Sequence, residues 1–329
     1  MSQQPISVIR VVLAVLEFLA KYPGILMRDV FRYFTARRKS VKDQVVVITG
    51  AAGGVGQELS EVFALQHGAR VVMLDVNETD VHAAASKLIE AGGQAVAFKC
   101  DVTKPDNLRS IADEIYRLYE KVDILVCNAG VLHLGYMHEL KDEHIRKIID
   151  VNLMGYFWTI RAFLPKMIDS DAGHIVLNSS VTAFYGESRG SAYSASKYAI
   201  SGLMESLQYE LYEQNKRNIK LTTVYPFFIR TPLLKHCTLT SSLLQPMEPR
   251  SVAERIIDAI LLERFEVYIP KKLRILTLLS NLLRTENARF EMRKFTGVQI
   301  KNTEVYLPNG VSHQMNEHQT IEPKARDWS

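Results

Sequence analysis

The chain has 329 residues, of which 47% are hydrophobic, and a formal net charge of +4 at pH 7. Residues 1–40 hold seven Lys or Arg and two Asp or Glu, so the basic excess belongs to this segment and the remainder is slightly acidic. This distribution excludes a nucleic-acid-binding surface, which needs a basic patch on the folded domain. Three cysteines without C-x-x-C spacing exclude a disulfide framework and indicate a reducing compartment, and the nine histidines form no metal-ligand cluster.

The first segment predicts a membrane anchor over residues 1–40. Its apolar run is interrupted by Arg10 and Glu17 and is broken by Pro23-Gly24. A spanning helix needs about 20 mostly apolar residues and a cleaved signal peptide needs a small-residue cleavage site, so neither fits. We expect a monotopic anchor whose apolar faces lie in the lipid boundary and whose basic residues meet anionic headgroups. The alternative is a helix packed on the protein's own surface or at a dimer contact.

The next element is a buried strand that enters a glycine-rich turn. The β-branched run at 45–48 predicts the strand, and the turn T-G-x-x-x-G-x-G precedes a helix-like segment at 57–67. Glycines let the backbone approach a pyrophosphate closely, and a helix N-terminus supplies unpaired N–H groups. Strand, turn and helix in this order are typical of a dinucleotide fingerprint. The predicted cofactor contacts in the turn are Gly50, Gly54, Val55 and Gly56.

A second predicted strand, 70–74, ends in Asp75 about 20 residues beyond the turn. An acid at this position accepts hydrogen bonds from the adenosine ribose hydroxyls and would repel a 2′-phosphate. Neither Ala51 in the turn nor Val76 after the acid is basic. The pattern therefore favours NAD(H) over NADP(H).

Strand-like and helix-like segments alternate up to about residue 270. This alternation predicts an α/β fold: a single doubly wound parallel-sheet (Rossmann-type) domain with helices on both faces. No Pro/Gly/Ser-rich linker interrupts the region, so we predict one dinucleotide-binding catalytic domain over 41–270.

Within this domain a phenol and an ammonium group lie four residues apart, on Tyr193 and Lys197. A helix over 190–215 would put both on one face. Free tyrosine has a pKa near ~10, and a neighbouring Lys⁺ lowers it, which makes a tyrosine a general acid/base. Ser180 can then hold the substrate oxygen that gains or loses a proton. Alone, Y-x-x-x-K is a weak signal, because such a pair usually lies on a helix surface.

The glycine turn, the acid after the second strand and Ser…Tyr-x-x-x-Lys, in this order, resemble the short-chain dehydrogenase/reductase family over residues 42–270. Three further segments support the resemblance: an Asp-Val pair after a strand at 94–99, an Asn-Ala-Gly segment after a strand at 123–126, and the stretch 226–231. In this family they lie beside the adenine, the cofactor and the nicotinamide carboxamide. The resemblance thus adds these cofactor contacts: Asp101, Val102, Asn128, Ala129, Gly130, Tyr193, Lys197, Pro226, Ile229 and Thr231.

The resemblance also implies a catalytic set of four residues. Tyr193 exchanges the proton, Ser180 orients the substrate oxygen, and Lys197 lowers the tyrosine pKa and binds the nicotinamide ribose. Asn152 matches the fourth catalytic residue of the family, which holds a water in the proton relay.

Two positions depart from the family pattern. Phe227 stands where the family usually has glycine, and we expect it to restrict the backbone near the nicotinamide and to add an apolar wall. Cys127 stands where asparagine is frequent, and a small buried thiol is a plausible core substitute.

Two segments follow the predicted domain. Residues 271–304 are rich in leucine with flanking Lys and Arg, which predicts an amphipathic helical extension, either a second interfacial helix or a lid over the substrate site. Residues 305–329 are polar without periodicity, which predicts a disordered tail.

The predicted substrate pocket is apolar. The segment 233–247 carries many leucines and should cover it. Such walls indicate a lipophilic small-molecule substrate, an alcohol or ketone. The predicted substrate contacts are His133, Met137, Tyr185 and Leu233.

The anchor, the 226–231 stretch and the leucine-rich extension look most like the subgroup of epidermal retinol dehydrogenases and lipid-droplet 17β-hydroxysteroid dehydrogenases. This resemblance implies NAD-dependent oxidation of retinol, a hydroxysteroid or a related lipid alcohol at the endoplasmic reticulum membrane or a lipid droplet, with the catalytic domain facing the cytosol. It also implies a homodimer through the helices that hold Asn152 and Tyr193. The alternatives are an NADPH-dependent reductase of lipid ketones or aldehydes, and a non-enzymatic droplet coat protein that retains cofactor binding. The intact Asn-Ser-Tyr-Lys set argues against the coat protein.

Overall fold

The computed structural model describes residues 8–234, 237–240, 245–282, 285–287, 290–291, 294, 299–302, 304–306 and 312–314. The chain divides into two compact units, Met1–Lys39 and Ser40–Ser329.

In the first unit, helix α1 (Val8–Thr35) is continuous over 28 residues. The predicted break at Pro23-Gly24 was wrong, because one proline removes a single backbone hydrogen bond and good helix formers on both sides continue the helix across it. Continuity brings five of the six charged side chains of α1 into one stripe, since they recur at spacings of seven, four, seven and four residues, and only Asp29 lies off it. The stripe consists of Arg10, Glu17, Lys21, Arg28 and Arg32. No helix in the described part of the chain, α1 included, is both long and apolar enough to cross a bilayer.

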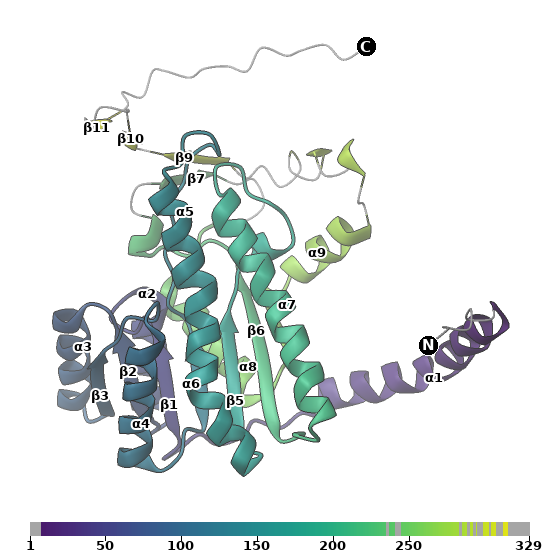
Figure 1. The fold of residues 1–329 in the computed structure, drawn as a ribbon, viewed down its shortest axis with the longest axis horizontal. Helices are drawn as coiled ribbons and strands as arrows, with labels where there is room; N and C mark the ends of the chain where they lie inside the picture. The colour runs from purple at the N-terminus through teal and green to yellow at the C-terminus, as the bar shows by residue number, and fades with distance from the viewer. Residues whose placement is uncertain are drawn as a thin grey trace, which may run out of the picture. The chain divides into compact units, whose positions relative to one another are not determined.

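The second unit contains a seven-stranded sheet in the order β3-β2-β1-β4-β5-β6-β8 (Figure 1). Every pair of neighbouring strands is parallel. This confirms the predicted doubly wound parallel-sheet fold. The strand order reverses between β1 and β4, and in such sheets ligands bind in the crevice beyond the carboxyl ends of the strands at that point. The strands are β1 (Val45–Thr49), β2 (Arg70–Asp75), β3 (Gln94–Lys99), β4 (Ile124–Cys127), β5 (Gly173–Asn178), β6 (Ile219–Pro226) and β8 (Glu266–Ile269).

Helices cover both faces of this sheet (Figure 1). Side chains alternate along a strand, so Val46 and Ile48 of β1 enter one core cluster while Val45 and Val47 enter the other. The first cluster includes α2, α3 and α8, and the second includes α4, α6 and α7. Burial on both faces explains why β1 reads as a continuous apolar run. The helices are α2 (Gly54–Glu61), α3 (Glu78–Glu90), α4 (Pro105–Tyr119), α5 (Asp142–Ile149), α6 (Gly155–Ser170), α7 (Ser191–Glu213) and α8 (Pro249–Leu261).

The predicted helical extension at 271–304 is helical over α9 (Leu273–Leu282), but its end is extended. Strand β9 (Gln299–Asn302) pairs antiparallel with β7 (Cys237–Thr240), so backbone pairing with a distant segment replaces the helix there. Strand β10 (Glu304–Tyr306), which begins at the last residue of the predicted extension, pairs with β11 (Ser312–Gln314) in the predicted disordered tail. The rest of that tail lies outside the described residues.

Candidate active site

The glycine turn after β1 is closed tightly against the end of β4. Gly50 has φ +66°, and a Cβ added there would lie 2.7 Å from Ala129 Cα. A Cβ on Gly56 would lie 2.0 Å from the Gly50 carbonyl oxygen, so no side chain fits at that position. Gly54, with φ +54°, begins α2. The turn therefore presents bare backbone at the N-terminus of α2, as a pyrophosphate site requires.

Asp75, the last residue of β2, is fixed beside this turn. Its Oδ2 accepts a hydrogen bond from Ala52 N at 3.0 Å, and its Oδ1 accepts one from Asn77 N at 3.0 Å. The carboxylate lines the same cavity as Gly50 and Gly54. These two backbone donors hold an acceptor in the position that the sequence predicts for ribose recognition.

Asn128 ties the end of β4 to the turn. Its Nδ2 donates to the carbonyl oxygens of Thr49 and Gly50, both at 3.1 Å. The hydroxyl of Thr49 accepts in turn from Asn128 N at 3.0 Å and Ala129 N at 3.2 Å. Asn128 thus contributes to the cavity mainly by fixing the glycine turn relative to the end of β4.

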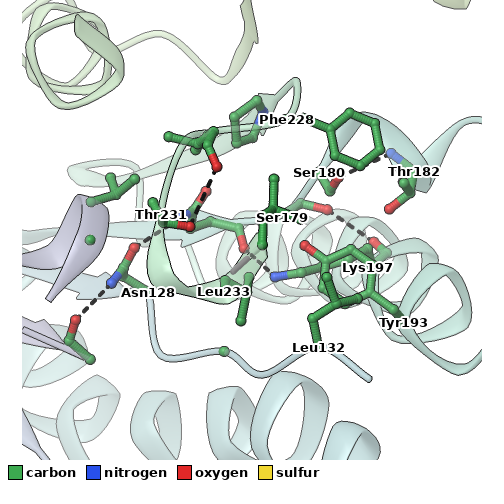
Figure 2. Close-up of a pocket in the computed structure, with 18 of the residues that line it drawn as sticks. Asn128, Leu132, Ser179, Ser180, Thr182, Tyr193, Lys197, Phe228, Thr231 and Leu233 are labelled. Atoms are coloured by element: carbon green, nitrogen blue, oxygen red, sulfur yellow. Dashed lines mark hydrogen bonds between the residues drawn. The ribbon is translucent and has the colours of Figure 1, made fainter. Parts of the chain in front are cut away.

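Ser180, Tyr193 and Lys197 come together in one cavity (Figure 2). Ser180 lies just after β5, and its hydroxyl accepts a hydrogen bond from Thr182 N at 3.2 Å. Tyr193 and Lys197 lie one turn apart near the start of α7, with Lys197 Nζ 5.6 Å from the Tyr193 ring centroid. The i,i+4 spacing has placed both groups on the same face, as predicted.

Asn178, at the end of β5, is a site residue that the sequence analysis missed. Its carbonyl oxygen accepts from Lys197 Nζ at 2.8 Å and from the Tyr156 hydroxyl at 3.0 Å. Its Nδ2 donates to Asn128 Oδ1 at 2.9 Å, whereas its own Oδ1 is buried without a hydrogen-bond partner in the described part of the chain. The available signal was a polar residue at the carboxyl end of a central strand, directly before the serine pair.

Burial dominates the electrostatics of the two ionisable groups. It raises the pKa of Tyr193 to about 12, although the hydrogen bond with Ser180 opposes this rise. It lowers the pKa of Lys197 to about 7, because desolvation disfavours the charged ammonium. The Y-x-x-x-K spacing predicts only the attraction between Lys⁺ and phenolate. In the folded protein, desolvation acts against both charged forms.

Asn152 lies in a π-helical turn, Asp150–Met154, between α5 and α6. Its Oδ1 accepts from Val131 N at 2.8 Å, and its Nδ2 donates to the Val131 carbonyl at 2.9 Å and to Ser196 Oγ at 3.4 Å. The side chain is fully buried and does not line the cavity. It holds the segment after β4 against α7, and its part in a proton relay stays a prediction.

The cavity has a volume of about 330 Å³. The predicted site residues that line it are Gly50, Gly54, Val55, Asp75, Asn128, Ala129, Gly130, Ser180, Tyr193, Lys197, Pro226, Ile229, Thr231 and Leu233. Gly56 and Asn152 do not line it: Gly56 packs against the Gly50 carbonyl, and Asn152 is hydrogen-bonded to Val131. Asp101 and Val102 do not line it: the Asp101 carboxylate accepts from Thr103 N at 2.9 Å, and Val102 is buried.

Three of the four predicted substrate contacts lie elsewhere than in the cavity wall. The ring of His133 stacks on that of His144, with centroids 4.2 Å apart. Met137 is largely exposed, and Tyr185 packs against the small cluster around Phe227. Alternation within a loop is irregular, so the sequence indicated the right segments but not which side chains point inward. Leu134 and Phe228 line the cavity instead.

Phe227 is buried and packs with Leu273 at the start of α9. Its ring meets that of Phe228 edge-on, with centroids 5.0 Å apart, and both residues line the cavity. The side chain thus forms the apolar wall predicted for it. It also connects the cavity to α9, a contact that a glycine could not make.

Comparison with known proteins identifies the family. The sequence model of short-chain dehydrogenases matches residues 44–241. The chain is 36% identical to human epidermal retinol dehydrogenase 2 over 256 residues, which covers 77% of this chain and 82% of that protein. It is 32% identical to human estradiol 17-beta-dehydrogenase 11 over 251 residues, covering 76% and 83% of the two chains. It is also 33% identical to mouse 17-beta-hydroxysteroid dehydrogenase 13 over 266 residues, covering 79% and 86%.

Solved structures agree with these sequence comparisons. A short-chain dehydrogenase/reductase from Burkholderia phymatum in complex with NAD superposes with a TM-score of 0.67 at 25% identity, covering 73% of this chain and 94% of that one. A metagenomic short-chain oxidoreductase in complex with NADP superposes with a TM-score of 0.59 at 28% identity, covering 70% and 98%.

Fold and site together define an oxidoreductase that acts on alcohols with a nicotinamide cofactor. The chain belongs to the short-chain dehydrogenase/reductase family and is related to its retinol and hydroxysteroid dehydrogenases. This confirms the resemblance found in the sequence.

Proposed function

We propose that this protein oxidises a lipophilic alcohol with NAD as the hydride acceptor. The observation that carries the proposal is the single cavity that holds both the fixed Asp75 carboxylate and the Ser180, Tyr193 and Lys197 set. The direct test is NADH formation by detergent-solubilised protein supplied with NAD⁺ and a panel of retinol, hydroxysteroids and long-chain alcohols. No turnover together with no binding of NADH or NADPH would favour the coat-protein alternative.

The residues present fit a dinucleotide. The glycine turn is a cradle that a Cβ at Gly50 or Gly56 would fill, and the buried Asn178 Oδ1 can accept a hydrogen bond from a bound group. Gly54 and Val55 would meet the pyrophosphate, Asp75 the adenosine ribose, and Ile229 and Thr231 the nicotinamide end. The bound nicotinamide supplies the carbon that accepts the hydride.

The protein's own part in the reaction is proton removal and orientation. Tyr193, as phenolate, takes the proton of the substrate hydroxyl, a type of help typically worth about 10²–10⁴ in rate. In the protein without substrate, the hydrogen bond between Ser180 and Tyr193 lowers the tyrosine pKa. When substrate is bound, the single hydroxyl proton of Ser180 is donated to the substrate oxygen and orients it. Lys197, held by the Asn178 carbonyl, favours the phenolate when it is protonated.

The cavity walls support a lipophilic substrate. Apart from the catalytic groups, the substrate end is lined mainly by apolar side chains: Leu132, Leu134, Phe227, Phe228, Leu233 and Leu234. Such walls bury the apolar surface of a bound substrate and offer few hydrogen-bonding groups to a polar metabolite. The relatives are named for retinol and for the hydroxysteroid estradiol, and both compounds are lipophilic alcohols.

For cofactor choice we predict that Asp75→Ala weakens NADH binding about tenfold or more, since hydrogen bonds to a charged group are worth ~1.5–3 kcal/mol. Discrimination against NADPH should relax, because the carboxylate no longer repels the 2′-phosphate. Fluorescence titration with NADH and NADPH measures both effects. Asp113→Ala, an exposed acid on α4, is the matched control.

An unchanged NADH/NADPH preference in Asp75→Ala would remove Asp75 from the cofactor site. The Asp75→Asn variant separates binding from structure. Its amide oxygen can keep one of the backbone hydrogen bonds while the repelling charge is gone.

We further propose that α1 anchors the protein monotopically to the endoplasmic reticulum membrane or a lipid droplet, with the catalytic domain in the cytosol. The support is its charged stripe beside a wide apolar surface, which suits a helix lying in the interface. A homodimer through the helices that hold Asn152 and Tyr193 belongs to the same proposal.

For the anchor we predict that deleting residues 1–39 moves the protein from the membrane to the soluble fraction, as measured by flotation. Replacing Arg10, Arg28 and Arg32 with Gln should weaken binding to anionic vesicles about 100-fold, at roughly 1 kcal/mol per basic residue, and leave binding to neutral vesicles little changed. Membrane association that survives the deletion would instead assign the contact to α9.

A further inference from the structure

The ammonium group of Lys197 lies beside two tyrosine rings. Its Nζ is 5.6 Å from the ring centroid of Tyr193, the tyrosine of the catalytic set (Figure 2), and 5.5 Å from that of Tyr156. Tyr193 precedes the lysine by one turn of α7, whereas Tyr156 comes from the first turn of α6. Proton removal from an alcohol uses Tyr193 and leaves Tyr156 without a part.

Tyr156 is held by the same carbonyl group that holds the lysine. Its hydroxyl donates to the Asn178 carbonyl oxygen at 3.0 Å, and Lys197 Nζ donates to that oxygen at 2.8 Å. A carbonyl oxygen has two lone pairs, so it can accept both hydrogen bonds at once. The Tyr156 side chain is 1% exposed, and turning the ring away from the lysine would leave a buried donor unpaired.

The face of an aromatic ring attracts a cation that lies within about 6 Å of the centroid, because the face carries negative charge density. This attraction is larger at a desolvated site than at the surface. Lys197 is 4% exposed, and its Nζ donates to a neutral carbonyl rather than to a carboxylate. The ring of Tyr156 therefore offsets part of the cost of burying the ammonium.

The ionisable groups around Lys197 come from several elements. Tyr193 lies on the same helix, Tyr156 on α6, and Cys127 of β4 lies close enough to Tyr156 to affect its pKa. Burial raises the pKa of all three, so they are uncharged at pH 7. The acids that line the same cavity are Asp75, at the end of β2, and Glu187, on the segment before α7.

We propose that Tyr156 is a positioning residue for the catalytic lysine. Its ring face stabilises the Lys197 ammonium, and its hydroxyl keeps the ring in place by binding the carbonyl that Lys197 also binds. Tyr156 does not line the cavity, so it acts on the reaction through Lys197. This inference rests on the proposed function, because it assumes that the ammonium favours the phenolate of Tyr193.

The expected pH profile has a definite sign. Tyr193 and Lys197 together lose two protons, and the first leaves the lysine, whose pKa of about 7 is the lower one. The reactive form, phenolate beside ammonium, is a minor arrangement of the pair after this first loss. The value of kcat/KM should therefore rise with pH through the first step and reach a plateau. A weaker attraction between ring and ammonium moves this rise to lower pH and lowers the plateau by the same factor, because the ammonium becomes rarer within the pair.

The test changes the charge density of the ring at nearly constant shape, in full-length protein in detergent with NAD⁺ and a lipid alcohol that the wild type oxidises. Tyr156→Phe keeps the ring face, and Tyr156→trifluorophenylalanine weakens it, since fluorine withdraws electron density from the ring. Relative to Tyr156→Phe, the trifluoro variant should lose about tenfold in plateau kcat/KM, and its acid limb should move down by about one pH unit. Tyr156→Phe itself should lie within about threefold of the wild type, because it loses one neutral hydrogen bond.

The matched control is Phe163→trifluorophenylalanine. Phe163 is buried on the same helix, and its ring lies beside that of Tyr116, with centroids 5.9 Å apart. The plateau and the acid limb should both stay unchanged in this variant. For Tyr156→trifluorophenylalanine, a lower plateau without a shift of the acid limb, or no change in either, would overturn the inference, because a packing defect moves no protonation step.

If the wild type oxidises no alcohol, the proposed function fails, and the protonation of Lys197 is then measured without turnover. The ¹³Cε resonance of Lys197 in lysine-labelled protein, assigned by its loss in Lys197→Met, gives the midpoint directly. A midpoint that falls by about one pH unit from Tyr156→Phe to the trifluoro variant supports the contact between ring and ammonium. An unchanged midpoint contradicts it.

Discussion

Tyr193→Phe is expected to lower kcat for alcohol oxidation by about 10²–10⁴ or beyond detection, while NADH binding stays close to that of the wild type. Phenylalanine fills the same volume on α7 but has no oxygen to take the substrate proton. The cofactor cradle at Gly50, Gly54 and Asp75 comes from other elements and does not depend on this hydroxyl. The measurement pairs NADH production with a fluorescence titration of NADH on the same protein.

The matched control for this variant is Tyr198→Phe, five residues further along α7 on a side chain that is 44% exposed. It removes the same atom outside the cavity and should keep full turnover. Normal kcat in Tyr193→Phe would remove the tyrosine from the proton transfer. A loss of NADH binding together with turnover would mean that the hydroxyl maintains the site rather than the chemistry.

The sheet was predictable from the sequence because its strands are buried on both faces. A short, continuous β-branched run such as 45–49 is typical of a strand buried on both faces of a parallel sheet. The segments between the strands have helical periodicity. The glycine turn was equally clear, since the approach of Gly56 to the Gly50 carbonyl leaves no room for a side chain. Strong steric constraints of this kind leave a signature in residue type.

Features that depend on orientation or on distant partners were not predictable. His133 and Leu134 are neighbours in one loop, yet only Leu134 lines the cavity, and no periodicity distinguishes them. The strand β9 depends on pairing with β7, a segment about 60 residues away. The continuity of α1 through Pro23 reflects the balance between one lost hydrogen bond and two strong flanking helices.

The electrostatics of the catalytic pair show the same limit. The i,i+4 spacing predicted that Tyr193 and Lys197 share a face, and it did so because helix geometry is fixed. The pKa values depend on desolvation, which a sequence does not record. Burial holds the pKa of Tyr193 near 12 and that of Lys197 near 7, so neither charged form is favoured by the protein alone.

This balance leads to a prediction for Lys197→Met: catalysis falls while stability rises. The kcat/KM for alcohol oxidation should drop about 100-fold, because no ammonium remains to favour the phenolate or to bind the nicotinamide ribose. Methionine follows the path of the lysine stem, and the Asn178 carbonyl keeps its hydrogen bond from the Tyr156 hydroxyl at 3.0 Å. The free energy of unfolding at pH 7 should increase on the order of 2 kcal/mol, because folding of the wild type must either bury the Lys197 ammonium or release a proton that the unfolded chain binds.

The sign of the pH dependence follows from the lowered pKa. As the pH falls from 10.5 toward 7, the unfolded wild-type chain takes up a proton at Lys197 that the folded protein does not bind. The wild type therefore loses stability over this window relative to the variant, which cannot titrate there. Denaturant unfolding of both proteins at pH 7 and pH 10 should show the largest difference at pH 7 and a smaller one at pH 10. A variant less stable than the wild type at pH 7, or a difference that grows with pH, would mean that Lys197 is charged in the folded protein and stabilised by its contacts.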